Sequence, residues 1–194
     1  MMSGIVIISG ACGTGKSTIS RLLAESSLCQ YTVHMHTDDF YAYIRKGYIE
    51  PWKDESGDQN EVVIHAVTAS AKQFIAGGYE VYVDGVIGPW FLKQWLKLAG
   101  EGYDVRYVIL RPDEESTVFR AANREQREEF PLDSEAVRKM WNMFSELGEY
   151  EANVIDTTNQ TASESAALIK KLLNDGKFRV SENLTKPPQC GGQC

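Results

Sequence analysis

The sequence predicts an α/β fold of three layers, in which helices cover both faces of a five-stranded parallel sheet and a helical lid lies over one end. Short apolar runs rich in β-branched residues alternate with stretches of helical periodicity, and this alternation is typical of βαβ units. A chain of 194 residues is long enough to bury one sizeable core. We therefore expect a single domain over residues 1–180 and a disordered tail over residues 181–194.

Each element follows from its local pattern. The first strand is continuous and β-branched, the first helix carries an amphipathic apolar face, and Pro89 opens the third helix. The segment Tyr48–Asn60 is polar with Pro and Gly, so it reads as a loop, and loops of that length are often functional. The expected strands are Gly4–Ser9, Tyr31–His36, Glu80–Asp84, Val105–Leu110 and Asn153–Asp156. The expected helices are Lys16–Ser27, Glu61–Ala76, Pro89–Ala99, Glu114–Glu129, Asp133–Leu147 and Ser163–Asn174.

Charge and composition limit the classes of partner that the protein can have. The net charge of −7 provides no global basic surface, which disfavours nucleic acid as the substrate. The N-terminus lacks a basic leader, and no apolar run approaches the roughly 20 residues of a spanning helix, so we expect a cytoplasmic protein without membrane contact. Cys190 and Cys194 cannot by themselves complete a four-ligand zinc site. The sequence leaves the oligomeric state open between monomer and homodimer.

A glycine-rich motif follows the first strand. Residues 10–17 fit the P-loop pattern G-x-x-x-x-G-K-[ST], in which backbone N–H groups surround phosphate oxygens. Lys16 is expected to reach the phosphates of ATP, and Ser17 to hold Mg²⁺. Because the motif lies between an apolar strand and an amphipathic helix, this reading is favoured over a glycine-rich turn with an incidental lysine. The expected nucleotide-binding residues are Gly10, Ala11, Cys12, Gly13, Thr14, Gly15, Lys16, Ser17 and Thr18.

Other motifs narrow the class of P-loop protein. The chain has no Asn-Lys-x-Asp motif, which guanine-nucleotide switches need, and no Leu-Ser-Gly-Gly-Gln signature of transporter ATPases. Asp38 and Asp39 follow the second strand, at the sheet edge where ligands bind in open α/β folds. A carboxylate there can accept the proton of a hydroxyl that attacks the γ-phosphate, and we assign this role to Asp38. The alternative is that both carboxylates cap a helix at Phe40–Lys46, a possibility with most weight for Asp39.

With these motifs in order, the chain resembles the small P-loop kinases. This group includes gluconate kinase, chloramphenicol phosphotransferase and the 5′-hydroxyl kinase domain of polynucleotide kinase, which have AAA-type ATP-binding domains. The resemblance covers almost the whole chain. It implies transfer of the γ-phosphate of ATP to a hydroxyl of a small molecule such as a sugar acid, an antibiotic or a nucleoside-like compound. Tyr41 stands where polynucleotide kinases have an arginine, and the next basic residues are Arg45 and Lys46, which weighs against a nucleic-acid 5′ end.

Two further motifs complete the predicted site. Asp84 ends the third strand and resembles a Walker B acid that holds Mg²⁺ together with Ser17; the alternative is a contact with the acceptor. Arg120, Arg124 and Arg127 share one helix face. In the resembling kinases, arginines of a lid close over the phosphates, which implies catalytic roles for Arg120 and Arg124 in a lid over about residues 112–132. The alternative for the three arginines is a solvated face with Arg–Glu pairs.

Weaker signals concern the periphery of the site. The resemblance implies that the adenine end lies near residues 156–161, although Thr161 can equally cap the final helix with Glu164. Trp90, Phe91 and Trp95 are candidates for the wall of the acceptor pocket or for ordinary core aromatics. Two histidines, His34 and His36, share a strand face, and we expect them to be packed or hydrogen-bonded rather than metal ligands. The rival function from another class is an ATP-dependent switch without a small acceptor.

Overall fold

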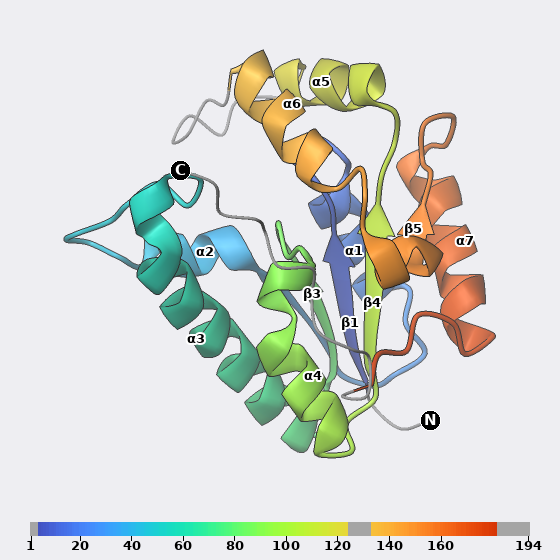
Figure 1. The fold of residues 1–194 in the computed structure, drawn as a ribbon. Coiled ribbons are helices and arrows are strands. Elements are labelled where there is room, and N and C mark those ends of the chain that lie inside the picture. The colour runs from blue at the N-terminus through green and yellow to red at the C-terminus, as the bar shows by residue number, and fades with distance from the viewer. Residues whose placement is uncertain (1–3, 124–132, 182–194) are drawn as a thin grey trace.

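The computed structural model describes residues 4–123 and 133–181 of the chain (Figure 1). Its centre is a five-stranded, fully parallel sheet with the strand order β2-β3-β1-β4-β5. This confirms the predicted α/β fold class. The strands are β1 (Ile5–Ser9), β2 (Thr32–His36), β3 (Glu80–Asp84), β4 (Val105–Leu110) and β5 (Val154–Ile155).

Helices cover both faces of the sheet. Helices α3 and α4 pack on one face and α1 and α7 on the other, while α5 and α6 lie together above the carboxyl ends of the strands (Figure 1). The α-helices are α1 (Lys16–Glu25), α2 (Thr37–Ala42), α3 (Gly57–Ala76), α4 (Lys93–Gly100), α5 (Glu114–Ala122), α6 (Ser134–Met143) and α7 (Ala162–Asn174). Short 3-10 helices occupy Asp54–Ser56, Pro89–Phe91 and Gly148–Asn153.

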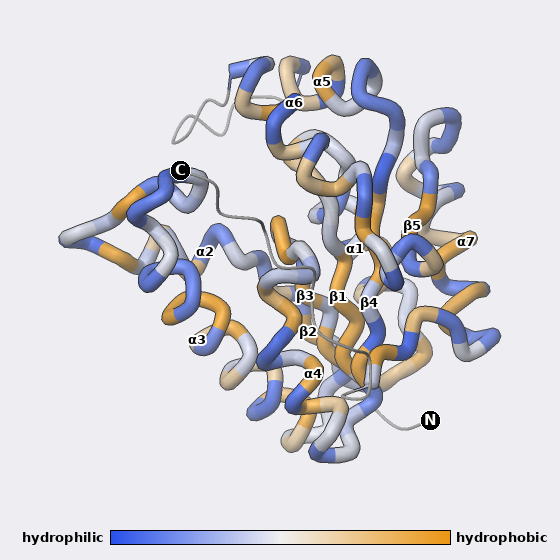
Figure 2. The backbone as a smooth tube through the Cα atoms, viewed as in Figure 1, coloured by the Kyte–Doolittle hydropathy of each residue, from blue (hydrophilic) through white to orange (hydrophobic). Residues whose placement is uncertain are grey.

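The central strand β1 explains why the sequence of the sheet reads as continuous apolar runs. Successive side chains of a strand point to opposite faces. Ile5 and Ile7 therefore enter the core under α3 and α4, and Val6 and Ile8 enter the core under α1 and α7. All four are buried, and hydrophobic residues accordingly gather along the strands (Figure 2).

The helix expected over Pro89–Ala99 begins at Lys93, because Pro89–Phe91 form a separate 3-10 turn before it. Two further helix starts, both beside the candidate site, also differ from the prediction. Helix α2 begins at Thr37 rather than Phe40 and ends at Ala42, because the extended backbone of His36 leads directly into it. Asp38 and Asp39 are thus inside its first turn, where acidic groups suit the positive helix end, and they are not its N-cap. Helix α3 begins at Gly57, after a 3-10 turn, so the expected loop over residues 48–60 is shorter.

The later helices differ in length from the expectation. Helix α6 ends at Met143, after which Phe144 and Leu147 pack into the core and a 3-10 helix leads to β5. Helix α7 begins after Thr161, whose side chain accepts from the Glu164 N–H in a complete capping box. This confirms the capping reading. Residues 124–132 of the expected helix Glu114–Glu129 and the tail residues 182–194 lie outside the described residues. No described helix has the length and apolar content needed to cross a membrane.

Candidate nucleotide and phosphoryl-transfer site

The predicted P-loop joins β1 to α1 through a tightly packed turn. Gly10, Gly13 and Gly15 have positive φ angles of 138°, 86° and 88°, a region that other residues rarely adopt. A Cβ on Gly10 would stand 2.3 Å from the Leu110 carbonyl oxygen, and one on Gly13 would stand 2.5 Å from that of Thr117. The loop is therefore held from below by β4 and from the side by α5, and it needs glycine for both contacts.

Hydrogen-bonding groups of the loop turn toward its own backbone and toward α6. Lys16 is 8% exposed, and its ammonium donates to the Ala11 carbonyl at 2.7 Å, which also accepts from the Thr14 hydroxyl at 3.0 Å. The Cys12 N–H donates to Sδ of Met140 at 3.1 Å. Helix α1 starts at Lys16, so its positive end faces the loop. This curled backbone with a buried ammonium fits a phosphate group.

A second cluster forms where β3 and β2 end beside the P-loop. Asp84 is fully buried, and its Oδ2 accepts from the Ser17 hydroxyl at 2.7 Å and bonds His36 Nδ1 at 2.8 Å. Its Oδ1 bonds His34 Nε2 at 2.5 Å. The register explains this meeting, since His36 pairs directly with Asp84 and His34 lies two residues back on the same strand face. The two predicted metal ligands, Ser17 and Asp84, are thus in contact.

Asp38 joins this cluster from the first turn of α2. His36 Nε2 lies 3.0 Å from its carboxylate Oδ2, while the Asp38 side chain is 69% exposed. The structure therefore brings Lys16, Ser17, Asp84 and Asp38 to one sheet edge, with His36 between the two carboxylates. Asp39 is also exposed on α2.

Charge coupling within the cluster shifts the pKa of three groups. Burial alone would raise the pKa of Asp84, but hydrogen bonds from His34 and His36 outweigh it and hold that pKa far below its ordinary value. Burial alone would lower the pKa of His36, yet its bonds to Asp38 and Asp84 raise it to about 10. Burial alone would also raise the pKa of Asp38. The hydrogen bond from His36 and the positive charges of His36 and Lys16 outweigh it, so that pKa is lowered. The cluster thus holds two carboxylates around one imidazolium.

The donor set fits magnesium better than a transition metal. In the described part of the chain, no group of three or more His, Cys, Asp or Glu side chains is arranged so that it could hold a metal ion. A serine hydroxyl beside one carboxylate is instead a partial oxygen donor set, and Mg²⁺ usually completes such a set with waters and substrate phosphates. Both histidines are hydrogen-bonded to Asp84, as expected from the sequence.

Helices α5 and α6 border the site, but the predicted lid arginines are only partly described. Arg120 donates to the carbonyls of Thr157 at 3.0 Å and Thr158 at 2.9 Å, so it supports the turn after β5. That turn is the predicted adenine end, and the buried Thr157 hydroxyl has no hydrogen-bond partner among the described residues. Arg124 and Arg127 lie outside the described residues.

The side of the site beyond Asp38 contains hydrogen bonds that the sequence did not predict. The Tyr41 hydroxyl donates to Asn60 Oδ1 at 2.9 Å, and the buried Asn60 amide also donates to the Pro51 carbonyl and the Ser56 hydroxyl. The neighbouring Gln59 bonds both the N–H and the carbonyl of Ile49. These contacts fix the segment after α2 against the start of α3. Reading residues 48–60 as one loop concealed them.

The three aromatic candidates for the wall of the acceptor pocket differ in burial. Trp95 is fully buried, so it is a core residue rather than part of a pocket wall. Trp90 is partly exposed and packs against Phe91 and Phe144, with ring centroids 6.3 and 5.6 Å away. A wall role therefore remains a prediction for Trp90 and Phe91 alone.

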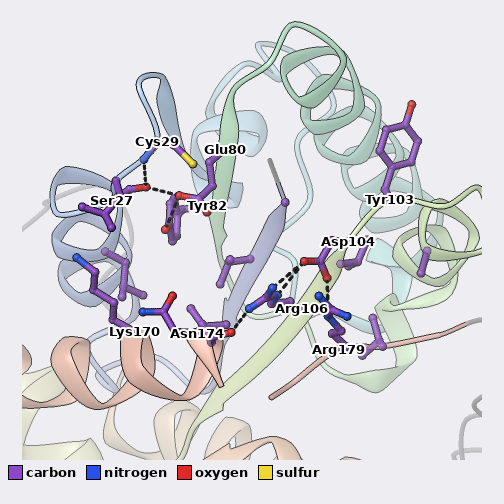
Figure 3. A pocket seen from close by; sticks show the side chains of 18 of the residues that line it. Ser27, Cys29, Glu80, Tyr82, Tyr103, Asp104, Arg106, Lys170, Asn174 and Arg179 are labelled. Carbon is purple, nitrogen blue, oxygen red and sulfur yellow. Dashed lines mark hydrogen bonds and ion pairs between the residues drawn. The ribbon is translucent and has the colours of Figure 1, made fainter. Parts of the chain in front are cut away.

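A cavity of about 540 Å³ lies at the opposite edge of the sheet, where β1, β3 and β4 begin (Figure 3). On one side of it, Glu80 accepts from the hydroxyls of Ser27 at 2.5 Å and Tyr82 at 2.8 Å. On the other side, Asp104 pairs with Arg106 and Arg179. These polar groups are bonded to one another, and no P-loop residue lines the cavity, so we place the functional site at the carboxyl edge instead.

Comparison with known proteins agrees with this geometry. Residues 6–140 match a family model described as an AAA domain. No curated protein matches the sequence.

Three solved structures show the same fold at low identity. A gluconokinase from Sinorhizobium meliloti 1021 is similar with a TM-score of 0.59 and 19% identity, over 91% of this chain and 98% of that one. A sugar kinase from Janibacter sp. HTCC2649 has a TM-score of 0.65 and 16% identity, over 89% and 95%. A chain of the Pnkp1/Rnl/Hen1 RNA repair complex has a TM-score of 0.59 and 22% identity, and the match covers 73% of this chain but only 44% of that chain.

Proposed function

The chain belongs to the AAA domain family, and from this premise we propose that it is an ATP-dependent phosphotransferase that moves the γ-phosphate of ATP to a hydroxyl of a small molecule. One observation carries the proposal: the P-loop, the Ser17–Asp84 pair and the exposed carboxylate of Asp38 meet at one edge of the sheet. A nucleotide-binding protein that only hydrolyses ATP or signals its presence has no need of a carboxylate aimed at a second substrate.

The residues divide into three roles. The P-loop N–H groups and Lys16 would hold the phosphates, and Ser17 with Asp84 would hold Mg²⁺. Asp38 would accept the proton of the acceptor hydroxyl, whose oxygen forms a new bond to phosphorus as the bond to the leaving oxygen breaks. Bound ATP supplies the transferred phosphoryl group. Because the pKa of Asp38 is lowered, the carboxylate is ionised at neutral pH and can take up that proton.

The nucleotide orientation follows from the two ends of the site. The phosphates belong at the P-loop, and we place the base at the turn after β5, where the Thr157 hydroxyl is buried without a partner among the described residues. Arg120 would then support the base end. Arg124 stays a proposed catalytic arginine of the lid.

The acceptor would lie beside Asp38, on the side where α2 packs against the start of α3. Tyr41 and Asn60 give that side polar groups held in place by hydrogen bonds. The net charge of −7 favours a small acceptor over a polynucleotide. A sugar acid such as gluconate, a hydroxylated antibiotic and a nucleoside-like molecule are the acceptor classes to test first. We infer a cytoplasmic protein that acts as a monomer or a homodimer.

The test is a screen of pooled hydroxyl compounds with ATP and Mg²⁺, read by mass detection of phosphorylated products. A new product that requires both ATP and Mg²⁺ is the expected result. ATP binding without product from any pool would favour the nucleotide-switch function. A product found only with 5′-hydroxyl oligonucleotides would favour the nucleic-acid kinase function.

A further inference from the structure

The ring of His36 bridges two carboxylates that come from different elements. Its Nδ1 is 2.8 Å from Asp84 Oδ2, and its Nε2 is 3.0 Å from Asp38 Oδ2. Ionised carboxylates only accept hydrogen bonds, so a ring that bonds both must donate from both nitrogens. The imidazole is therefore a fixed connection between the end of β3 and the first turn of α2.

The backbone around this bridge is held firmly. His36 pairs with Asp84 in the β2–β3 register and is followed at once by Thr37, the buried first residue of α2. A Cβ on Gly85 would stand 2.1 Å from the Thr37 hydroxyl, so the glycine allows α2 to start in contact with the end of β3. His36 itself is 11% exposed. The ring thus has little freedom to leave Asp38.

Asp38 differs from Asp84, the other carboxylate bonded to His36, because most of the Asp38 side chain faces solvent. Its side chain is 69% exposed, and an exposed aspartate samples several rotamers unless a contact selects one. Its carboxylate has a long contact of 3.5 Å with the Thr37 hydroxyl, and the shorter bond of 3.0 Å comes from the largely buried ring of His36. A base must lie within hydrogen-bond reach of the proton it takes, so the rotamer of Asp38 matters for transfer.

We propose that His36 is a positioning residue, which holds the Asp38 carboxylate toward the P-loop by anchoring it to Asp84. This inference rests on the proposed function, because it assumes that Asp38 serves phosphoryl transfer. His36 touches neither nucleotide nor acceptor in this role. Its effect on transfer passes through Asp38, and that dependence separates it from a merely structural histidine.

His34 is the matched control for His36. It lies on the same face of β2 and bonds the same Asp84 carboxylate, but its contact is with Oδ1, and no bond to Asp38 is found among the described residues. Loss of His34 removes support from Asp84 alone. Loss of His36 removes support from Asp84 and from Asp38.

The first test is a pair of double-mutant cycles, with the transfer rate measured at saturating Mg²⁺ and ATP on the acceptor found in the pooled screen. His36→Leu should lower kcat about tenfold to a hundredfold, the loss expected for a hydrogen bond to a charged group, with nucleotide Kd changed much less. In the Asp38→Asn background the same change should cost less than about threefold. His36→Gln, which keeps an amide donor, should recover part of the loss.

In the control cycle, His34→Leu should lower the rate by the same factor with Asp38 or Asn at position 38. An equal loss from His36→Leu in both backgrounds would overturn the inference while leaving the proposed function intact. If Asp38→Asn transfers phosphate at the wild-type rate, the proposed base is wrong and the inference falls with it.

A second test needs no acceptor. The chain has three histidines, so ¹⁵N-histidine labelling gives only three imidazoles to assign. Asp38→Asn should move the Nε2 signal of His36 and leave both ring signals of His34 in place. A His36 Nε2 signal that is unchanged by Asp38→Asn, in the folded full-length protein, would contradict the bridge even if no acceptor is found.

Discussion

The backbone N–H of Cys12 donates a hydrogen bond to Sδ of Met140 at 3.1 Å, which ties the P-loop to α6 across 128 positions of the sequence. A P-loop N–H at this place is expected to donate to phosphate when nucleotide binds. Met140 and nucleotide then compete for one donor. Neighbouring contacts hold α6 at this site, since the Trp141 indole donates to the Pro112 carbonyl at 2.8 Å.

Met140→Leu should therefore tighten nucleotide binding. Leucine keeps the apolar volume of methionine but cannot accept the hydrogen bond, so the Cys12 N–H loses its partner only in the nucleotide-free protein. We expect the Kd of ATP, measured by calorimetry, to fall about two- to fivefold. Met143→Leu is the control, because Met143 is exposed on the same helix. Weaker or unchanged ATP binding by a folded Met140→Leu protein would show that the two contacts do not compete.

Ser17→Ala should separate magnesium binding from nucleotide binding. The Ser17 hydroxyl is bonded to Asp84, and its loss removes one oxygen from the proposed metal site while the P-loop backbone stays. The Mg²⁺ concentration for half-maximal activity should rise about tenfold or more, whereas ATP affinity without Mg²⁺ should change little. Ser20→Ala removes a buried hydroxyl from the same helix that has no partner among the described residues, and it should leave the Mg²⁺ titration as in wild type.

Gly10→Ala should destabilise the fold far more than Gly47→Ala. Both glycines have positive φ angles, 138° and 78°, but only Gly10 has a carbonyl oxygen 2.3 Å from the position of a Cβ. Backbone strain and overpacking together cost on the order of 2–4 kcal/mol, which lowers Tm by about 5–15 °C in a protein of this size. A Cβ on Gly47 would meet no atom within 4 Å beyond its chain neighbours, so Gly47→Ala adds only the backbone strain. Equal Tm losses in thermal melts would contradict the close packing of the P-loop against β4.

The Arg111–Glu151 pair should give a stability difference that depends on pH. The pKa of Glu151 is lowered first by its hydrogen bond from Arg111 and next by the Leu147 N–H. A carboxyl with a lowered folded pKa stabilises the fold above its unfolded value, near 4.5, and this stability is lost as pH falls through the folded pKa. Because the Glu151 side chain is 43% exposed, the effect is at most about 1 kcal/mol.

Glu151→Gln should accordingly melt below wild type at pH 7, and the difference in Tm should shrink as pH falls below about 4. Thermal melts of both proteins between pH 3 and 7 provide the measurement. A difference that grows toward acid pH would have the wrong sign for this assignment.

The backbone features of the candidate site that agree with the sequence prediction are set by local pattern, whereas the roles of its residues stay predictions. Residues 10–17 carry their backbone geometry in their glycines, and Asp84 is at a strand end because an apolar run stops there. Both therefore meet at the sheet edge once parallel strands are assumed. The resemblance to small P-loop kinases is confirmed at the level of fold and domain family.

The parts that were missed depend on contacts between distant residues. Helix α2 begins three residues earlier than the sequence predicts, because its N-cap is His36 in extended conformation and no Ser, Thr, Asp or Asn side chain marks the start. The sequence gives no signal for the start of α3 at Gly57, because glycine is typical of turns. The bonds of Asn60 to Pro51 and Ser56 hold that start in place. Met140 and Cys12 have no sequence signal that links them. The role of Arg120 likewise depended on which turn lies beside α5.

The most direct test of the proposed mechanism compares Asp38→Asn with Asp39→Asn in single-turnover transfer from ATP to the acceptor found by the screen. The two variants lose the same charge from adjacent positions of α2, but only Asp38 is bonded to His36. We predict that Asp38→Asn slows product formation at least about a hundredfold and leaves ATP affinity within about twofold, while Asp39→Asn stays much closer to wild type. Equal rates for wild type and Asp38→Asn would contradict the assignment of Asp38 as the base.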